Sequence, residues 1–168
     1  LEDASIGRMT HPVPYSEMDL QGVHLSPRFA VAKIKEDGST AIRPIDHFSW
    51  ADVAQSGLGK RKWKEYQKQI SVNGFCVAGE HVQHDHLDSL AEALHKVVAR
   101  TNSQCGLFKA DINSAFRQIP LQAEHVWASG IAFLYMGRVV TASHKALPFG
   151  AVASVHAWER VGALLTRI

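Results

Sequence analysis

The residues best suited to do chemistry lie between positions 108 and 121, in the sequence FKADINSAFRQIPL. Asp111 follows an apolar run that predicts a short buried strand over residues 107–112. A carboxylate at the end of such a strand can hold a divalent cation at a rigid edge. Phe116 comes five residues later, directly after the small Ala115, and can form a floor under whatever the metal binds. Since Asp is also a common helix cap, this segment alone leaves a catalytic and a structural interpretation open.

Two other groups of residues have the types needed for phosphate or metal binding but lack the spacing. Residues 57–60 (GLGK) end like a phosphate-binding loop, yet no Gly stands five positions before the second Gly and Arg replaces the Ser or Thr after the Lys. His81, His84 and His86 lie close together, but zinc needs three or four ligands in a closed geometry. We interpret these histidines as surface or capping residues.

Residues 57–68 (GLGKRKWKEYQK) form a basic run with interleaved aromatic side chains. A surface that contacts phosphates and stacks bases needs both kinds of residue, although a solvated helix or loop has the same composition. The first interpretation makes four side chains candidate nucleic-acid contacts: Lys60, Arg61, Lys62 and Lys64.

Local patterns predict the elements that must position these residues. Residues 29–34 and 40–45 are strand-like and flank Asp37-Gly38, a strong turn signal, which predicts a β-hairpin. Residues 126–135 and 138–146, joined at Met136-Gly137, predict a second one.

Two helices and an irregular lead-in complete the expected organisation. Residues 87–100 carry apolar side chains at helical spacing, which predicts an amphipathic helix with one buried face. Residues 152–168 predict a closing helix, and the prolines and glycines of residues 1–30 predict an irregular start. Antiparallel hairpins packed on helices indicate an α+β fold.

Three segments resemble, in the same order, motifs of reverse transcriptases of the retrotransposon type. Residues 108–121 resemble the palm motif in which an Asp is followed by three residues, a small residue and Phe or Tyr. Residues 146–158 (ALPFGAVASVHAW) resemble the next palm motif, a Leu-Pro-(Phe/Gln)-Gly turn that enters a helix. Residues 29–46 resemble the fingers hairpin. The resemblance covers roughly residues 28–47 and 104–162.

The resemblance implies an RNA-directed DNA polymerase, a nucleotidyltransferase that extends a primer 3′ end on a template by a two-metal mechanism with Mg²⁺ or Mn²⁺. It implies that Asp111 is a catalytic, metal-binding carboxylate and that the backbone carbonyl of Ile112 is a further metal ligand. The implied partners are an RNA or DNA template–primer and a deoxynucleoside triphosphate.

The resemblance also implies a nucleotide-binding set. Phe116 would lie beneath the incoming sugar and exclude a 2′-hydroxyl, whereas Phe149 and Gly150 would face the nucleotide and template. The cations of the fingers hairpin would reach the triphosphate: Arg43 and either Lys35, which we favour, or Lys33.

The sequence departs from the family's pattern in places that support a second hypothesis. Trp158 replaces the usual Phe, Ser154-Val155 replace a small residue and Pro, and run 57–68 has the character of an insertion. The family's paired Asp-Asp motif does not occur in these 168 residues, which predicts that the chain is a fragment that is inactive alone. The alternative is a non-catalytic, polymerase-derived module that binds nucleic acid or serves as a structural subunit of a larger assembly.

Two regions follow from this interpretation. Residues 1–104 would form a fingers-like region with the basic insertion and the amphipathic helix, and residues 105–168 a partial palm that ends before the second acidic motif.

Composition sets the remaining bounds. A hydrophobic content of 46% against 20% charged residues supplies a core and excludes a disordered or low-complexity chain. The formal charge of +2 is too small to indicate nucleic-acid binding by itself. No apolar stretch is long enough for a membrane span. Two cysteines are too few for a disulfide framework and indicate an intracellular protein, in the nucleus or cytoplasm for a retroelement, with an organelle left open.

Overall fold

The computed structural model describes residues 2–19, 21–51, 70–82, 86–107 and 109–165. It contains two compact units, which are described separately below. The first unit combines two stretches of chain, Leu1–Ala78 and Ser114–Ile168, and the second is the intervening stretch Gly79–Asn113. These bounds differ from the fingers-like and palm-like regions expected from the sequence.

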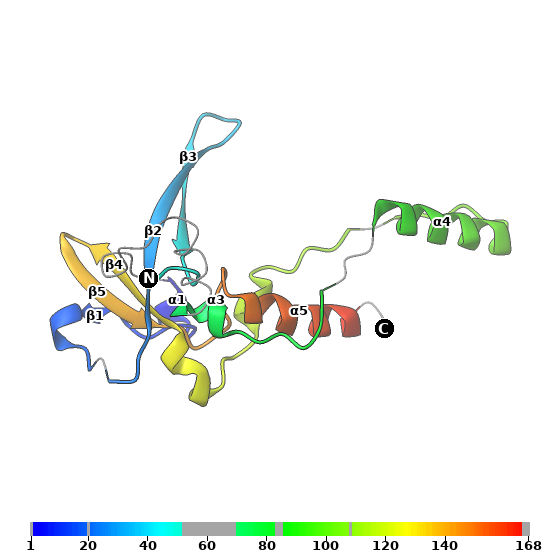
Figure 1. Cartoon of the computed structure of the whole chain (residues 1–168). Helices are drawn as coiled ribbons and strands as arrows, with labels where there is room; N and C mark the ends of the chain where they lie inside the picture. The colour runs from blue at the N-terminus through cyan, green and yellow to red at the C-terminus, as the bar shows by residue number, and fades with distance from the viewer. Residues whose placement is uncertain (1, 20, 52–69, 83–85, 108, 166–168) are drawn as a thin grey trace, which may run out of the picture. The chain divides into compact units, whose positions relative to one another are not determined.

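Five strands of the first unit form one mixed sheet (Figure 1). Its strand order is β1-β5-β4-β2-β3, with β2 parallel to β4 and the other neighbours antiparallel. The strands are β1 (Val13–Pro14), β2 (Leu25–Ile34), β3 (Thr40–Asp46), β4 (Gly130–Tyr135) and β5 (Arg138–Ser143). Together with the helices, this sheet confirms the predicted α+β fold class.

The first predicted hairpin is formed by β2 and β3. Their register runs from Arg28 opposite Asp46 to Ile34 opposite Thr40. Gly38 takes the positive φ of 77° that the turn requires, and the turn is closed by a hydrogen bond from the Lys35 amide to the Ser39 carbonyl. Only residues 25–27 of β2 pair with β4, so the rest of the hairpin extends past the sheet as a two-stranded arm (Figure 1).

The second predicted hairpin is formed by β4 and β5, but β4 begins later than expected. Met136 and Gly137 form the turn with φ of 48° and 75°, the left-handed pair that a tight hairpin turn needs. The chain before β4 forms the 3-10 helix η3 (Ala123–Ala128) instead of a strand. Ser129 closes that helix by donating from its amide and its hydroxyl to the Val126 carbonyl.

The first unit also contains several helical segments and a small buried core. The helices are α1 (Glu2–Ser5), η1 (Tyr15–Glu17), α3 (Val72–Phe75), η2 (Ala115–Gln118), η3 and α5 (Val152–Leu165). α5 confirms the predicted closing helix, whereas α1 and η1 are single turns within the lead-in that was expected to be irregular. The buried cluster consists of Ala4, Met9, Phe48, Ile131, Ala142 and Ala151.

The second unit contains the predicted amphipathic helix, α4 (Leu87–Thr101). The helix ends at Asn102, which adopts the left-handed conformation and donates its amide to the Val98 carbonyl. The expected burial of its apolar face is not observed, since no residue of α4 is buried and Leu87 is 80% exposed. The unit has a single helix in its described part and therefore no second layer of its own to cover that face.

Candidate functional site

The predicted metal ligands Asp111 and Ile112 lie in the second unit, and both are exposed. Residues 109–112 have no regular secondary structure, so the strand predicted to end at Asp111 is not formed. A strand needs a neighbour for its backbone hydrogen bonds, and every strand pairing among the described residues lies in the first unit. The described residues of this run, 107 and 109–112, therefore have no strand partner within the described ranges.

Within the described ranges, no group of three His, Cys, Asp or Glu side chains is close enough to hold a metal ion. His84 lies outside those ranges, so the histidine group at positions 81–86 is covered only in part. The basic run is likewise outside the described residues, including Lys60, Arg61, Lys62 and Lys64.

The structure brings together two of the predicted nucleotide-binding residues from segments about thirty positions apart. The ring centroids of Phe116 and Phe149 are 5.1 Å apart in an edge-to-face arrangement, a favourable geometry for aromatic pairs. Trp158, on α5, packs edge-on against Phe116 at 6.4 Å. Phe149 remains 55% exposed, so this aromatic cluster presents one open ring to solvent.

Gly150 lies directly against the base of the β2–β3 arm. Its φ is 90°, and a Cβ atom there would lie 2.6 Å from the carbonyl oxygen of Asp46. Asn73 holds the same loop by donating to the Gly150 carbonyl at 2.9 Å and accepting from the Val152 amide at 2.8 Å. A close approach to the Asp46 backbone therefore explains the glycine, and the expected approach to a nucleotide or template stays a prediction.

The predicted cations of the hairpin lie on the two-stranded arm and are exposed. Arg43 is directly opposite Val31, and Lys33 is opposite Ala41. Alternate residues of a strand share a face, so Arg43 and Lys33 lie diagonally across one face of the arm. Lys35 follows β2 at the turn. The arm therefore carries three exposed cationic side chains.

A buried polar network at the base of the arm was not predicted. Asp46 accepts two hydrogen bonds from Arg28, from Nε at 2.6 Å and Nη2 at 3.0 Å. His144 Nε2 lies 3.0 Å from the same carboxylate. The Arg28 guanidinium also lies 5.6 Å from the centre of the Phe133 ring. Burial alone would raise the pKa of Asp46, but the hydrogen bonds from His144 and Arg28, together with the charge of Arg28, lower it to about 2.

Arg117 extends this network toward the N-terminus and is itself buried. Its Nη1 lies 2.7 Å from Nδ1 of His144 and donates to the Ala146 carbonyl at 3.2 Å. Its Nη2 donates to the Arg8 carbonyl at 3.3 Å and pairs with Asp3 at 3.0 Å. One guanidinium therefore joins η2, the end of β5 and the segment after α1.

These contacts determine the tautomer of His144. A guanidinium can only donate, so Nδ1 of His144 must accept from Arg117. Nε2 then carries the proton and donates to Asp46, which makes the ring neutral. Burial lowers the pKa of His144 from its usual value of 6.5; hydrogen bonding to Asp46 opposes this change, and the charge of Arg117 adds to it.

One part of this network had a signal in the sequence. Extending the predicted hairpin by one residue on each strand places Arg28 opposite Asp46, and opposite charges across a strand pair attract. His144 and Arg117 had no comparable signal, because they reach Asp46 and Asp3 across 98 and 114 residues of sequence.

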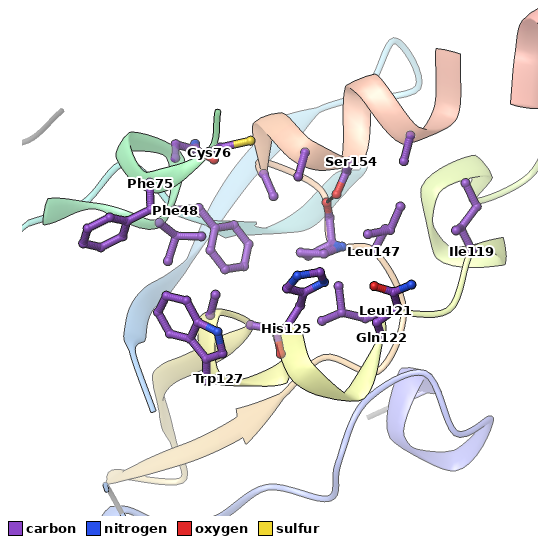
Figure 2. Close-up of a pocket in the computed structure, with 18 of the residues that line it drawn as sticks. Phe48, Phe75, Cys76, Ile119, Leu121, Gln122, His125, Trp127, Leu147 and Ser154 are labelled. Atoms are coloured by element: carbon purple, nitrogen blue, oxygen red, sulfur yellow. Dashed lines mark hydrogen bonds between the residues drawn. The ribbon is translucent and has the colours of Figure 1, made fainter. Parts of the chain in front are cut away.

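A separate cavity of about 630 Å³ lies in the first unit. Figure 2 shows Phe48, Phe75, Trp127 and Leu147 around it, with His125 and Gln122 among its polar side chains. The rings of Phe75 and Trp127 are 6.4 Å apart. None of the predicted site residues that the structure describes lines this cavity, so it is distinct from the aromatic cluster and the arm.

No protein-family model matches the chain, and no curated protein is significantly similar to it. In the described part of the chain, no helix is long and apolar enough to cross a membrane.

Proposed function

We propose that this chain is the fingers-and-palm part of an RNA-directed DNA polymerase of the reverse transcriptase type. The observation that carries the proposal is the contact between Phe116 and Phe149, with Gly150 against the base of the β2–β3 arm. Parts of all three segments that resemble polymerase motifs lie in the first unit although they are far apart in sequence, whereas Asp111 and Ile112 of the first palm motif belong to the second unit.

Each part of this arrangement has a role in nucleotide binding. Arg43 on the exposed arm, with Lys35 or Lys33, offers positive charge to a triphosphate, and phosphoryl transfer depends mainly on positioning and charge neutralisation. Phe116 supplies the bulk that excludes a 2′-hydroxyl. The exposed ring of Phe149 supplies an apolar surface for the nucleotide or template.

The metal donors satisfy this proposal only in part. The Asp111 carboxylate and the Ile112 carbonyl are hard oxygen donors of the kind that Mg²⁺ or Mn²⁺ prefers, and Mg²⁺ commonly keeps water and substrate phosphates as its other ligands. Both residues are exposed. Two-metal transfer needs further carboxylates, and among the described residues Asp111 belongs to no group of three His, Cys, Asp or Glu side chains that could hold a metal ion. We therefore assign these residues to one hydrated ion.

The direct test is primer extension by the natural protein that contains this sequence, with Asp111→Ala compared to Asp88→Ala. Asp88 is an exposed carboxylate in the first turn of α4 and serves as the matched control. We expect Asp111→Ala to lower the extension rate by about a hundredfold or more, as the loss of a major electrostatic contact does, and Asp88→Ala to leave it unchanged. Equal rates in wild type and Asp111→Ala would remove Asp111 from the proposal.

A second candidate is a non-catalytic module that binds nucleic acid or a protein partner. The observation that favours it is the exposed, irregular backbone at Asp111, where a catalytic carboxylate would need a rigid support. Salt-dependent binding of single-stranded RNA to this chain tests it, using a variant in which Lys60, Arg61, Lys62 and Lys64 are changed to Gln. A smaller salt slope in the variant, by about 0.7 for each lost phosphate contact, supports nucleic-acid binding. No affinity of the wild type at low salt favours a protein partner.

A further inference from the structure

We propose that Asp46, His144 and Arg117 are positioning residues that hold the aromatic cluster at a fixed place relative to the base of the β2–β3 arm. This inference rests on the proposed polymerase function, because it assigns these residues to nucleotide selection. None of them is a candidate for contact with the reacting atoms.

Each candidate nucleotide-binding segment is attached to one member of the network. Phe116 directly precedes Arg117 in η2. Arg43 lies on β3, three residues before Asp46, and Gly150 packs against the Asp46 carbonyl.

The loop before Gly150 is fixed in the same way. The Ala146 carbonyl accepts from Arg117 at 3.2 Å, and the Leu147 amide donates to the Ile119 carbonyl at 2.9 Å. These two hydrogen bonds join the segment that carries Phe149 to the segment that carries Phe116.

The network is balanced in charge only while His144 is neutral. Two cations, Arg28 and Arg117, face two anions, Asp46 and Asp3, and the His144 ring lies between them with Phe48 alongside at 6.2 Å. A polar network in a low-dielectric interior is rigid when all its members are paired. This arrangement can therefore hold the three segments within the small tolerance that nucleotide selection requires.

The test uses Arg117→Lys, with Arg138→Lys as the control at the exposed start of β5. A lysine keeps the charge but lacks the planar fork that makes the four contacts of Arg117. A second pair is His144→Leu and its exposed control His11→Leu, of which His144→Leu removes the acceptor that faces Arg117.

The first readout is structural and needs no activity. In this chain we expect nuclear Overhauser contacts between the rings of Phe116 and Phe149, and ¹⁵N shifts that show His144 protonated on Nε2 only. Both network variants should lose the ring contacts while contacts across the β4–β5 hairpin remain. A wild-type His144 protonated on Nδ1 would overturn the inference even if both variants fail to fold.

The second readout is nucleotide selection in primer extension by the natural protein. We expect the network variants to raise the KM for deoxynucleotides roughly ten- to a hundredfold, as a small misplacement does, and to accept ribonucleotides more readily, with a smaller change in kcat. Unchanged selection in Arg117→Lys, with wild-type extension intact, overturns the inference. Absence of extension in the wild type defeats the polymerase proposal instead, and the ring contacts then still decide whether the network positions Phe116.

Discussion

His144 is the residue that makes the buried network sensitive to acid. It accepts from Arg117 on one side and donates to Asp46 on the other, so a second proton on the ring would face a guanidinium. Charge balance among Arg28, Arg117, Asp46 and Asp3 would be lost as well. In the folded protein His144 therefore acts as a neutral side chain that accepts one hydrogen bond and donates another, as an amide side chain does.

This arrangement predicts a pH dependence of stability. The pKa of His144 in the folded state is lowered below 6.5. As the pH falls below 6.5, the unfolded state therefore binds a proton more readily than the folded state does. The free energy of unfolding consequently decreases as the pH falls. Asp46 acts in the same direction at lower pH. Its stabilisation is complete above 3.8 and is lost as the pH falls toward about 2, an effect of about 2 kcal/mol.

Urea unfolding between pH 8 and pH 5 measures the histidine contribution. The wild type should lose more stability over this range than His144→Gln, because the other histidines are common to both proteins. If the free energy of unfolding changed with pH by the same amount in both proteins, the assignment of His144 as neutral would be contradicted.

At the scale of elements, a glycine-to-alanine substitution, which adds one methyl group, tests the contact between the Gly150 loop and the β2–β3 arm. Gly150→Ala places a Cβ atom 2.6 Å from the Asp46 carbonyl at a φ of 90°, whereas Gly38→Ala has a similar φ of 77° and open space around it. We expect Gly38→Ala to cost about 1 kcal/mol for backbone strain alone and Gly150→Ala to cost at least about 2 kcal/mol. If urea unfolding gave the same loss of unfolding free energy for both variants, the Gly150 loop would be able to move away from the arm without a further loss of stability.

The elements that the sequence predicts correctly are those specified by local signals. Asp37-Gly38 and Met136-Gly137 determine the two hairpin turns, and the apolar spacing over residues 87–100 determines α4, because each signal acts within a few residues. The strand expected at residues 107–112 fails for the opposite reason: an apolar run cannot supply its own hydrogen-bonding neighbour.

The same distinction separates the predicted from the unpredicted parts of the site. Phe116, Phe149 and Gly150 could be chosen from motif spacing, and the structure brings them to one place. The network could not be chosen, because a buried Arg117 or His144 differs from an exposed one only in contacts made by residues far away in sequence.

At the scale of the whole molecule, the two units differ in how much they bury. No described residue of the second unit is buried, whereas the first unit contains the core cluster and the network. Segments without buried contacts open most readily. The second unit is therefore expected to be the least protected described part of the chain.

Limited trypsin digestion tests this difference. Among the described residues, the first cuts should fall at Lys96, Arg100 or Lys109, well before cuts at Arg28 or Arg117. The two resulting pieces should still elute together in gel filtration, because β2 pairs with β4 and Arg117 pairs with Asp3 across the cut. Early cleavage at Arg117, or separation of the pieces without denaturant, would contradict this account of the first unit.

The interrupted path of the chain through the first unit also affects the order in which it can assemble during synthesis. Asp46 is translated 98 residues before His144, an interval of roughly 5 to 20 seconds at the ordinary rate of translation. In that time Asp46 can pair with Arg28 inside the hairpin, but β4 does not yet exist to pair with β2. In the growing chain, β2 therefore lacks its neighbour β4 until the ribosome has translated the second unit. The sheet is complete only when Ser143 and His144 have been synthesised.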